Sequence, residues 1–274
     1  MKLSHFRRCH PSFFVVVVLA VGALLHGPIE QLHNYHAFAD QAVVWGVPHF
    51  ADVLSNLGFA LVALWGWYRL APMSREAVIV DGWGGYRLFL IGVFLTAIGS
   101  SYYHLAPDNA RLVWDRLPIA LTCAGLLAGV WGDTRKKHSN TLAGWLGVAA
   151  VLSVAWWRFT DLESVGDLRP YLLLQALPIL LIPLDQWLYE TPRTTRWAFS
   201  GALILYVIAK FAELGDHEIA ALSGGLTGHT LKHLLATGGV AVIVKSLVDR
   251  AKTASGTATT NTRLPRPQQY QKCI

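Results

Sequence analysis

Long apolar segments alternate with short polar stretches along most of the chain. Eight such segments can be placed, at about residues 12–26, 51–70, 86–105, 112–131, 141–157, 171–189, 197–213 and 227–248. Most of them approach the ~20 residues that a helix needs to cross the hydrocarbon core of a bilayer. They are apolar on every side, as is typical of helices packed together in lipid. The pattern predicts an all-α polytopic membrane helix bundle, with a seven-helix core and one extra N-terminal helix.

The two ends of the chain differ from this core. The basic stretch MKLSHFRR leads into FFVVVVLAVGALL, as in a signal peptide, but no small-residue cleavage site follows. We therefore interpret residues 1–26 as a signal anchor or an extra transmembrane helix, and residues 27–50 as an extracytoplasmic loop. Residues 51–250 make up the core. Residues 251–274, rich in Thr, Pro and Gln, are predicted to be a disordered cytoplasmic tail.

Composition and charge agree with a membrane protein and argue against two other classes. Of the 274 residues, 53% are hydrophobic and 15% are charged, whereas soluble domains carry about 25% charged residues. The net charge of +6 comes from Lys and Arg in short loops and at the termini, which argues against nucleic-acid binding. The three cysteines, Cys9, Cys123 and Cys273, lie far apart, which argues against a disulfide framework or a cysteine zinc site.

The basic residues also alternate between successive loops. The segment Gly27–Phe50 holds no Lys or Arg, whereas the later loop DTRKKH is basic. Under the positive-inside rule, this alternation predicts eight spans with both termini in the cytoplasm. The chain is therefore expected to be an integral, multi-pass membrane protein. Its oligomeric state does not follow from the sequence.

Five polar side chains lie at one predicted face of the membrane. Ser100 and His104 are spaced i,i+4 at the outer end of the third apolar segment, and Asp115 begins the fourth. In GHTLKH, His229 and His233 are again spaced i,i+4, at the outer start of the last segment. Counting membrane crossings therefore places all five at the same membrane face.

Three imidazoles that meet in one place indicate a zinc site. A catalytic zinc has three protein ligands and keeps a fourth position open for water, whose pKa it lowers. A nearby carboxylate can take the proton of that water, and a hydroxyl can donate to the oxyanion that forms at a carbonyl. We therefore interpret His104, His229 and His233 as metal ligands, Asp115 as the base and Ser100 as the oxyanion donor.

Each of these residues also has a purely structural interpretation, which the residues alone leave open. The histidine pair can bond to backbone at a helix end, and Ser100 can be a small packing residue in a membrane helix. Asp115 can pair with Arg111 or Arg116, and His104 can lie in the headgroup region. The structural interpretations require four independent explanations for polar residues on one membrane face, whereas a single site explains all of them.

Other polar residues are weaker candidates. Asp52 and Asn56 can support the site or can cap and pack a helix. Lys210 and Glu213 are spaced to pair with each other, and Lys232 is expected to face away from the two histidines that flank it. Three further histidines are expected to be solvated in the N-terminal loop, namely His33, His36 and His49.

These motifs together resemble a known superfamily. Ser-x3-His, an Asp eleven residues after that His, and a last-helix His-x3-His are shared by the membrane hydrolases that include alkaline ceramidases and adiponectin/progestin-type receptors. The chain looks most like alkaline ceramidases, including their bacterial relatives. ADVLSNLGFALVALWG is similar to their first core helix, and YHLAPDNARLVWDRLP and GHTLKHLLA are similar to the second-to-third helix junction and the seventh helix. The resemblance extends from about Phe38 to Asp249.

The resemblance implies zinc held by three histidines and hydrolysis of ceramide-like lipids to a sphingoid base and a fatty acid. His104, His229 and His233 match the zinc ligands, Asp115 matches the aspartate near the water, and Ser100 matches the serine. It further implies a hydrolase of sphingolipid metabolism, expected in a bacterial inner membrane. The alternation of basic loops predicts that the site faces the extracytoplasmic side. Its partners are then the membrane and a lipid substrate.

One family feature is missing. Eukaryotic alkaline ceramidases carry a calcium-binding Asp-Trp-Cys-Glu cluster before the first core helix, with a further Glu at the start of that helix. Here the region reads HNYHAFADQAVVWGVPHF, and His49 stands about where the later Glu would be. Asp40 and Asp52 are few carboxylates for calcium, so calcium regulation does not follow from the resemblance.

Three other functions remain open from the sequence. The chain can hydrolyse a different N-acyl lipid through the same chemistry. It can be a receptor-like or structural membrane protein in which zinc only joins helices. A haem or transport protein that uses membrane histidines is a third alternative, although the i,i+4 pair fits zinc better than haem.

Overall fold

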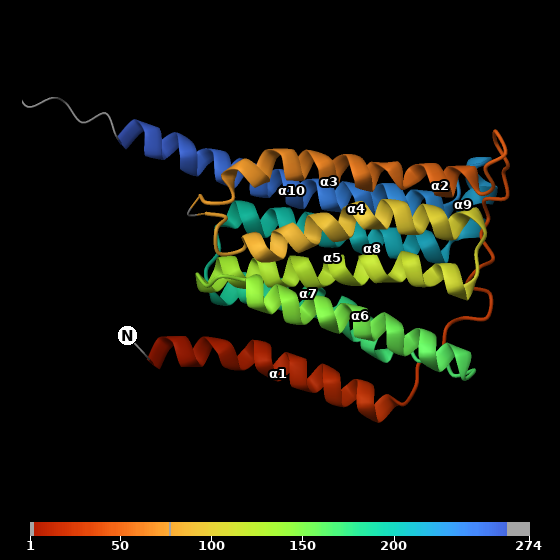
Figure 1. Ribbon diagram of the computed structural model, residues 1–274, viewed down its shortest axis with the longest axis horizontal. Coiled ribbons are helices and arrows are strands. Elements are labelled where there is room, and N and C mark those ends of the chain that lie inside the picture. The colour runs from red at the N-terminus through yellow and green to blue at the C-terminus, as the bar shows by residue number, and fades with distance from the viewer. Residues whose placement is uncertain (1–2, 77, 262–274) are drawn as a thin grey trace, which may run out of the picture.

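In the described part of the chain, seven long apolar helices form the body of the protein, and each runs antiparallel to the span before it (Figure 1). The computed structural model describes residues 3–76 and 78–261, and this part of the chain contains no β-strand. The seven spans are formed by α2 (Phe50–Ser55) with α3 (Leu57–Leu70) and the short 3-10 helix η1 (Ala71–Met73), α4 (Trp83–Leu105), α5 (Asn109–Arg135), α6 (Asn140–Leu162), α7 (Arg169–Leu188), α8 (Arg193–Leu214) and α10 (Gly228–Asn261). The predicted all-α multi-pass bundle is confirmed.

The predicted extra helix is present as α1 (Leu3–His26) and lies at the edge of the bundle (Figure 1). It packs against α7. Ser12 Oγ donates a 2.6 Å hydrogen bond to the buried carboxylate of Asp185, and Arg169 reaches the carbonyl of Ala23 at 3.2 Å. The apolar part of this helix, Pro11–His26, is shorter than the seven spans.

Close packing of α4 on α5 positions three of the five polar residues singled out above, namely Ser100, His104 and Asp115. A Cβ atom on Gly85 would lie 2.0 Å from the backbone nitrogen of Gly129, so the two helices touch through their backbones. In the turn that connects the two helices, α4 ends at Leu105. Pro107 favours this end, because proline lacks an N–H and disfavours helix in the residue before it. Asp108 then caps α5 by accepting from the Arg111 N–H at 2.7 Å. This short turn puts the end of α4 and the start of α5 at one level.

Two features differ from the predicted boundaries. A short helix, α9 (Asp216–Ser223), lies between α8 and α10 at the end of the bundle where α4 meets α5 (Figure 1). At the other end, α10 continues to Asn261, beyond the predicted core boundary at Arg250. The remainder of the predicted tail, residues 262–274, lies outside the described residues.

Candidate metal centre

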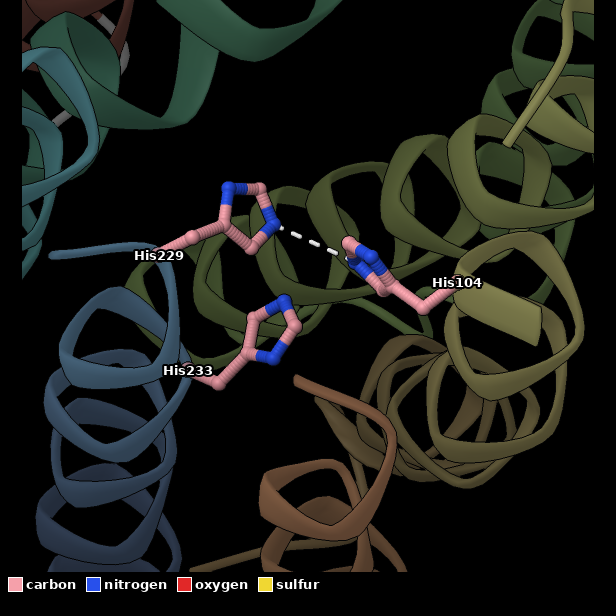
Figure 2. A group of neighbouring side chains, drawn as sticks. All are labelled: His104, His229 and His233. Carbon is pink, nitrogen blue, oxygen red and sulfur yellow. Dashed lines mark hydrogen bonds between the residues drawn. The ribbon is translucent and has the colours of Figure 1, made fainter. Parts of the chain in front are cut away.

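His104, His229 and His233 meet at one end of the bundle, where α4 and α10 approach each other (Figure 2). One ligand atom from each ring lies within 4.8 Å of the others. All three side chains are buried, with 1%, 5% and 4% exposure respectively. The three predicted ligands are therefore brought together from segments more than a hundred residues apart.

The arrangement fits a metal ion bound through imidazole nitrogens. His104 Nε2 and His229 Nε2 lie 3.2 Å apart, close to the ~3.3 Å that separates two nitrogens on a tetrahedral zinc with Zn–N bonds of ~2.0–2.1 Å. The Nδ1 atom of His104 is buried without a hydrogen-bond partner among the described residues. Three convergent, buried imidazoles are the donor set that zinc prefers in catalytic sites.

Ser55 and the backbone of Asp52 orient the His233 ring. Ser55 Oγ donates to the Asp52 carbonyl at 2.9 Å and lies 2.8 Å from His233 Nδ1. Because the hydroxyl has only one proton, it must accept from His233 Nδ1–H. The Asp52 carbonyl, at 3.2 Å, is a second acceptor for the same proton. His233 therefore keeps the lone pair on Nε2, as a metal ligand requires.

Polar contacts also fix the start of α10, which carries two of the histidines. Asp216 Oδ1 accepts from the His229 backbone N–H at 2.7 Å. Asp52 Oδ1 accepts from Thr230 Oγ1 at 2.6 Å and from Thr227 Oγ1 at 3.3 Å. Asp52 thus supports the site, which was one of its two predicted roles. Sequence reasoning did not identify Asp216 or Ser55, because their contacts come from distant segments.

Lys232 lies beside the cluster, so the prediction that it faces away is wrong. Its Nζ donates to His229 Nε2 at 2.8 Å and to Glu213 Oε1 at 2.9 Å. At i,i+3 from His229, its stem lies over the preceding turn on the same side of α10. A bound metal would compete with this ammonium for the His229 nitrogen. The predicted pair of Lys210 with Glu213 is present as well.

Ser100 and Asp115 lie together on facing surfaces of α4 and α5. Ser100 is 2% exposed, and its side chain interacts with the Asp115 carboxyl. Both residues line a cavity of about 380 Å³ whose wall also includes His233. The two predicted catalytic residues and one predicted ligand therefore line the same cavity.

The alternative pairings of Asp115 with an arginine are not formed. Arg111 pairs instead with Asp108, at 3.1 Å, on the outer surface of the turn. Arg116 points its guanidinium at aromatic rings, the nearest being that of Trp157 at 4.0 Å. Asp115 is therefore left to interact with Ser100 and the cavity.

The N-terminal loop covers the cluster instead of lying free in solvent. Phe38 is buried, and its ring centroid lies 4.7 Å from that of His104 and 4.5 Å from that of His229. His36 is held by the Tyr103 hydroxyl at 2.7 Å and by Asn109 at 2.8 Å. The solvated interpretation is therefore wrong for His36.

The same holds for His49, which is hydrogen-bonded to the Asp40 carbonyl, while His33 is exposed as expected. The two Asp40 carboxylate oxygens accept backbone N–H groups from Ala42, Ala51 and Asp52 at 2.9–3.1 Å. This carboxylate therefore caps the start of α2.

The loop is anchored to the bundle through Asp167, in the turn between α6 and α7. Asp167 accepts from the Ile29 N–H at 3.3 Å, from Trp156 Nε1 at 2.9 Å and from the Arg169 guanidinium at 2.9–3.1 Å. Burial opposes ionisation of the carboxyl, but the hydrogen bonds from Arg169 and Trp156 outweigh it and hold the Asp167 pKa at about 2. The loop that covers the histidines is thus tied to a stably ionised group.

Comparisons with family models, with curated proteins and with solved structures gave no match for this chain.

Proposed function

We propose that the chain is a zinc-dependent membrane amidohydrolase that cleaves the amide bond of ceramide-like lipids to a sphingoid base and a fatty acid. The observation that carries this proposal is the cavity wall on which Ser100, Asp115 and His233 meet. His233 belongs to the three-histidine cluster, so a substrate in the cavity would reach both the base and the metal centre.

The cavity suits a lipid chain. Its volume of about 380 Å³ falls within the range of ~300–1,000 Å³ that is typical of ligand pockets. Apolar side chains from several spans make up most of its wall, among them Phe89, Val93, Ile182, Phe199, Leu203 and Ile243. An acyl chain can therefore lie between the helices while its amide group lies at the polar end, near Asp115.

The chain's own residues supply the proton transfers. A zinc ion bound by the three histidines would supply a Lewis acid and a water that is nucleophilic at neutral pH. Asp115 accepts the proton of the attacking water and returns it to the leaving amine. Ser100 interacts with the Asp115 carboxyl, and in the proposed mechanism its hydroxyl first donates to the carboxylate and orients the base.

The single proton of Ser100 gives this residue two successive roles. While Asp115 is ionised, the hydroxyl is committed to it and cannot donate elsewhere. Once Asp115 has taken a proton, the carboxyl no longer requires this donor. The Ser100 hydroxyl can then turn toward the developing oxyanion of the amide carbonyl and stabilise it.

We place the site at the extracytoplasmic face of a bacterial inner membrane. The described end opposite the histidines carries the basic turns and helix starts, including Lys136, Lys137, Arg193 and Arg196. The positive-inside rule assigns that end to the cytoplasm. A cysteine introduced at the exposed His33 should react with a membrane-impermeant maleimide in intact cells, and protection from it would reverse the orientation.

Hydrolysis of a lipid panel tests the proposal. Purified protein is incubated with ceramide and with other N-acyl lipids, and the released fatty acid is quantified by mass spectrometry. Asp115→Asn should retain zinc yet lose about 10²–10⁴-fold in rate, whereas Asp108→Asn, in the adjacent turn, should stay active. An active Asp115→Asn protein would remove Asp115 as the base.

The panel also separates the alternatives. Turnover of other N-acyl lipids without turnover of ceramide would indicate a related lipid amidase. Stoichiometric zinc with no turnover of any amide lipid would favour a receptor-like or structural protein in which the metal only joins helices.

A further inference from the structure

Arg116 is a buried cation with no ion-pair partner among the residues that the structure describes. It is 3% exposed, and its Nε and Nη1 atoms are buried without a hydrogen-bond partner. Among the side chains that the structure describes, in residues 11–76 and 78–254, no carboxylate forms an ion pair with its guanidinium. Burial of an unpaired charge is strongly unfavourable, so an orphaned guanidinium requires an explanation.

Aromatic rings hold the guanidinium, but its Nε and Nη1 donors remain without a partner. Its Cζ atom lies 4.0 Å from the ring centroid of Trp157, 5.1 Å from that of Tyr35 and 5.5 Å from that of Tyr171. Cation–π contacts of this kind engage the faces of the rings and offset part of the desolvation. The N–H donors of arginine lie in the guanidinium plane, so contact with ring faces does not satisfy them.

The same residue forms part of the cavity wall that carries Asp115 and His233. Three cations and two carboxylates line this cavity, namely Arg116, Lys210, Lys232, Asp115 and Glu213. Glu213 pairs with both lysines, and the Asp115 carboxyl interacts with Ser100. With both carboxylates ionised, these five side chains carry one excess positive charge. Arg116 is the one cation of the three that has no ion pair among the described residues.

We infer that Arg116 binds the carboxylate of an acidic long-chain lipid in this cavity. A single carboxylate balances the single excess charge and matches the planar fork of an arginine. The carboxylate has two possible sources, the headgroup of an N-acyl amino acid or a free fatty acid. This inference deepens the proposed function. The free fatty acid as a source rests on that function, because hydrolysis of an N-acyl lipid releases a fatty acid.

Binding of two matched lipid pairs tests the inference. In the first pair, N-oleoylglycine and N-oleoylethanolamine share the acyl chain and the amide, but only N-oleoylglycine carries a carboxylate. In the second pair, oleate and oleyl alcohol both lack the amide, and only oleate carries a carboxylate. Affinities are measured by displacement of a labelled lipid from the full-length protein in nanodiscs. The acid of at least one pair should bind about tenfold tighter than its neutral partner, as expected for a buried charge-assisted contact.

Variants identify the residue responsible. Arg116→Gln should abolish the preference for the acid, and Arg116→Lys should retain part of it. Arg158→Gln is the matched control, because Arg158 pairs with Asp161 on α6 and does not line the cavity. A preference confined to N-oleoylglycine would assign the site to a headgroup, and a preference for oleate would assign it to the free acid.

Three results would overturn the inference. The first is equal affinity for the acid and the neutral lipid of both pairs in the wild type. The second is a preference that persists in folded Arg116→Gln. The third is a preference that disappears when the wild type is treated with a chelator, because such a loss would show that the metal had bound the carboxylate. The chelator experiment still tests the inference if Arg116→Gln does not fold. Displacement requires no turnover, so a protein without hydrolase activity can still show the preference.

Discussion

A methyl group on Gly99 would lie 1.9 Å from the carbonyl oxygen of Trp114. The backbones of α4 and α5 are therefore in direct contact at these two residues. Ser100 follows Gly99 and Asp115 follows Trp114, so this contact sets the distance between the hydroxyl and the carboxylate. The proximity of Ser100 to Asp115 therefore depends on a glycine that carries no chemistry of its own.

Gly99→Ala should therefore destabilise the protein and separate Ser100 from Asp115. The clash is with backbone, which cannot rotate away, so we expect a loss of about 1–3 kcal/mol or more in unfolding free energy. Thermal unfolding in detergent measures this loss. Gly144→Ala is the control, because nothing lies within 4 Å of its added methyl, and alanine should stabilise a helix by about 0.5–1 kcal/mol. Equal behaviour of the two variants would contradict the role assigned to the contact.

Ser55→Ala should weaken zinc binding without removing any ligand. The variant loses one of the two acceptors that hold His233 Nδ1–H, so the ring orientation becomes less fixed. Loss of such an outer partner typically lowers metal affinity by about 10–100-fold, and the remaining Asp52 carbonyl places the expected effect near tenfold. Competition with a fluorescent zinc chelator measures the affinity. Ser153→Ala, which removes a buried serine bonded to the Ala150 carbonyl on α6, should leave it unchanged.

Lys232→Met should strengthen zinc binding. The ammonium donates to His229 Nε2 and must give up that contact when a metal binds, and its positive charge opposes the metal. Its removal should raise zinc affinity by about tenfold, a difference of ~1.4 kcal/mol. The same chelator competition serves as the measurement, with Lys245→Met, at the far end of α10, as the control. Weaker binding in Lys232→Met would show that the lysine assists the metal instead.

The ionised Asp167 carboxylate should stabilise the folded protein until the pH falls below about 4. Its folded pKa of about 2 lies below the ordinary value of 3.8. The stabilisation that it provides is therefore complete above about pH 4 and is lost as the pH falls from 3.8 toward 2. The melting temperature of the wild type should fall more steeply in this window than that of Asp167→Asn, which is expected to be less stable at pH 7. Parallel pH profiles would refute the assignment.

Much of the fold and the convergence of the histidines could be predicted from the sequence. The apolar lengths define the spans, and loop parity alone places His104 and His229 at one end. These inferences succeed because a membrane restricts the chain to a few crossings with alternating direction.

Contacts between the ends of the spans could not be predicted in the same way. Phe38, Ser55 and Asp216 reach the site from a loop, a helix end and a short connecting helix, none of which has a periodic pattern. Lys232 was different, because its i,i+3 spacing from His229 already indicated that the two side chains lie on the same face of the helix. The unpaired state of Arg116 depends on side chains from three other segments and is evident only in three dimensions.

Metal content tests the assignment of His104, His229 and His233 most directly. Purified wild-type protein, analysed by inductively coupled plasma mass spectrometry, should contain about one zinc ion per chain. His233→Ala should lose it, and His138→Ala, which removes an exposed histidine at the opposite end, should keep it. Stoichiometric zinc in His233→Ala, or wild-type protein without bound metal after purification in zinc-containing buffer, would contradict the metal centre.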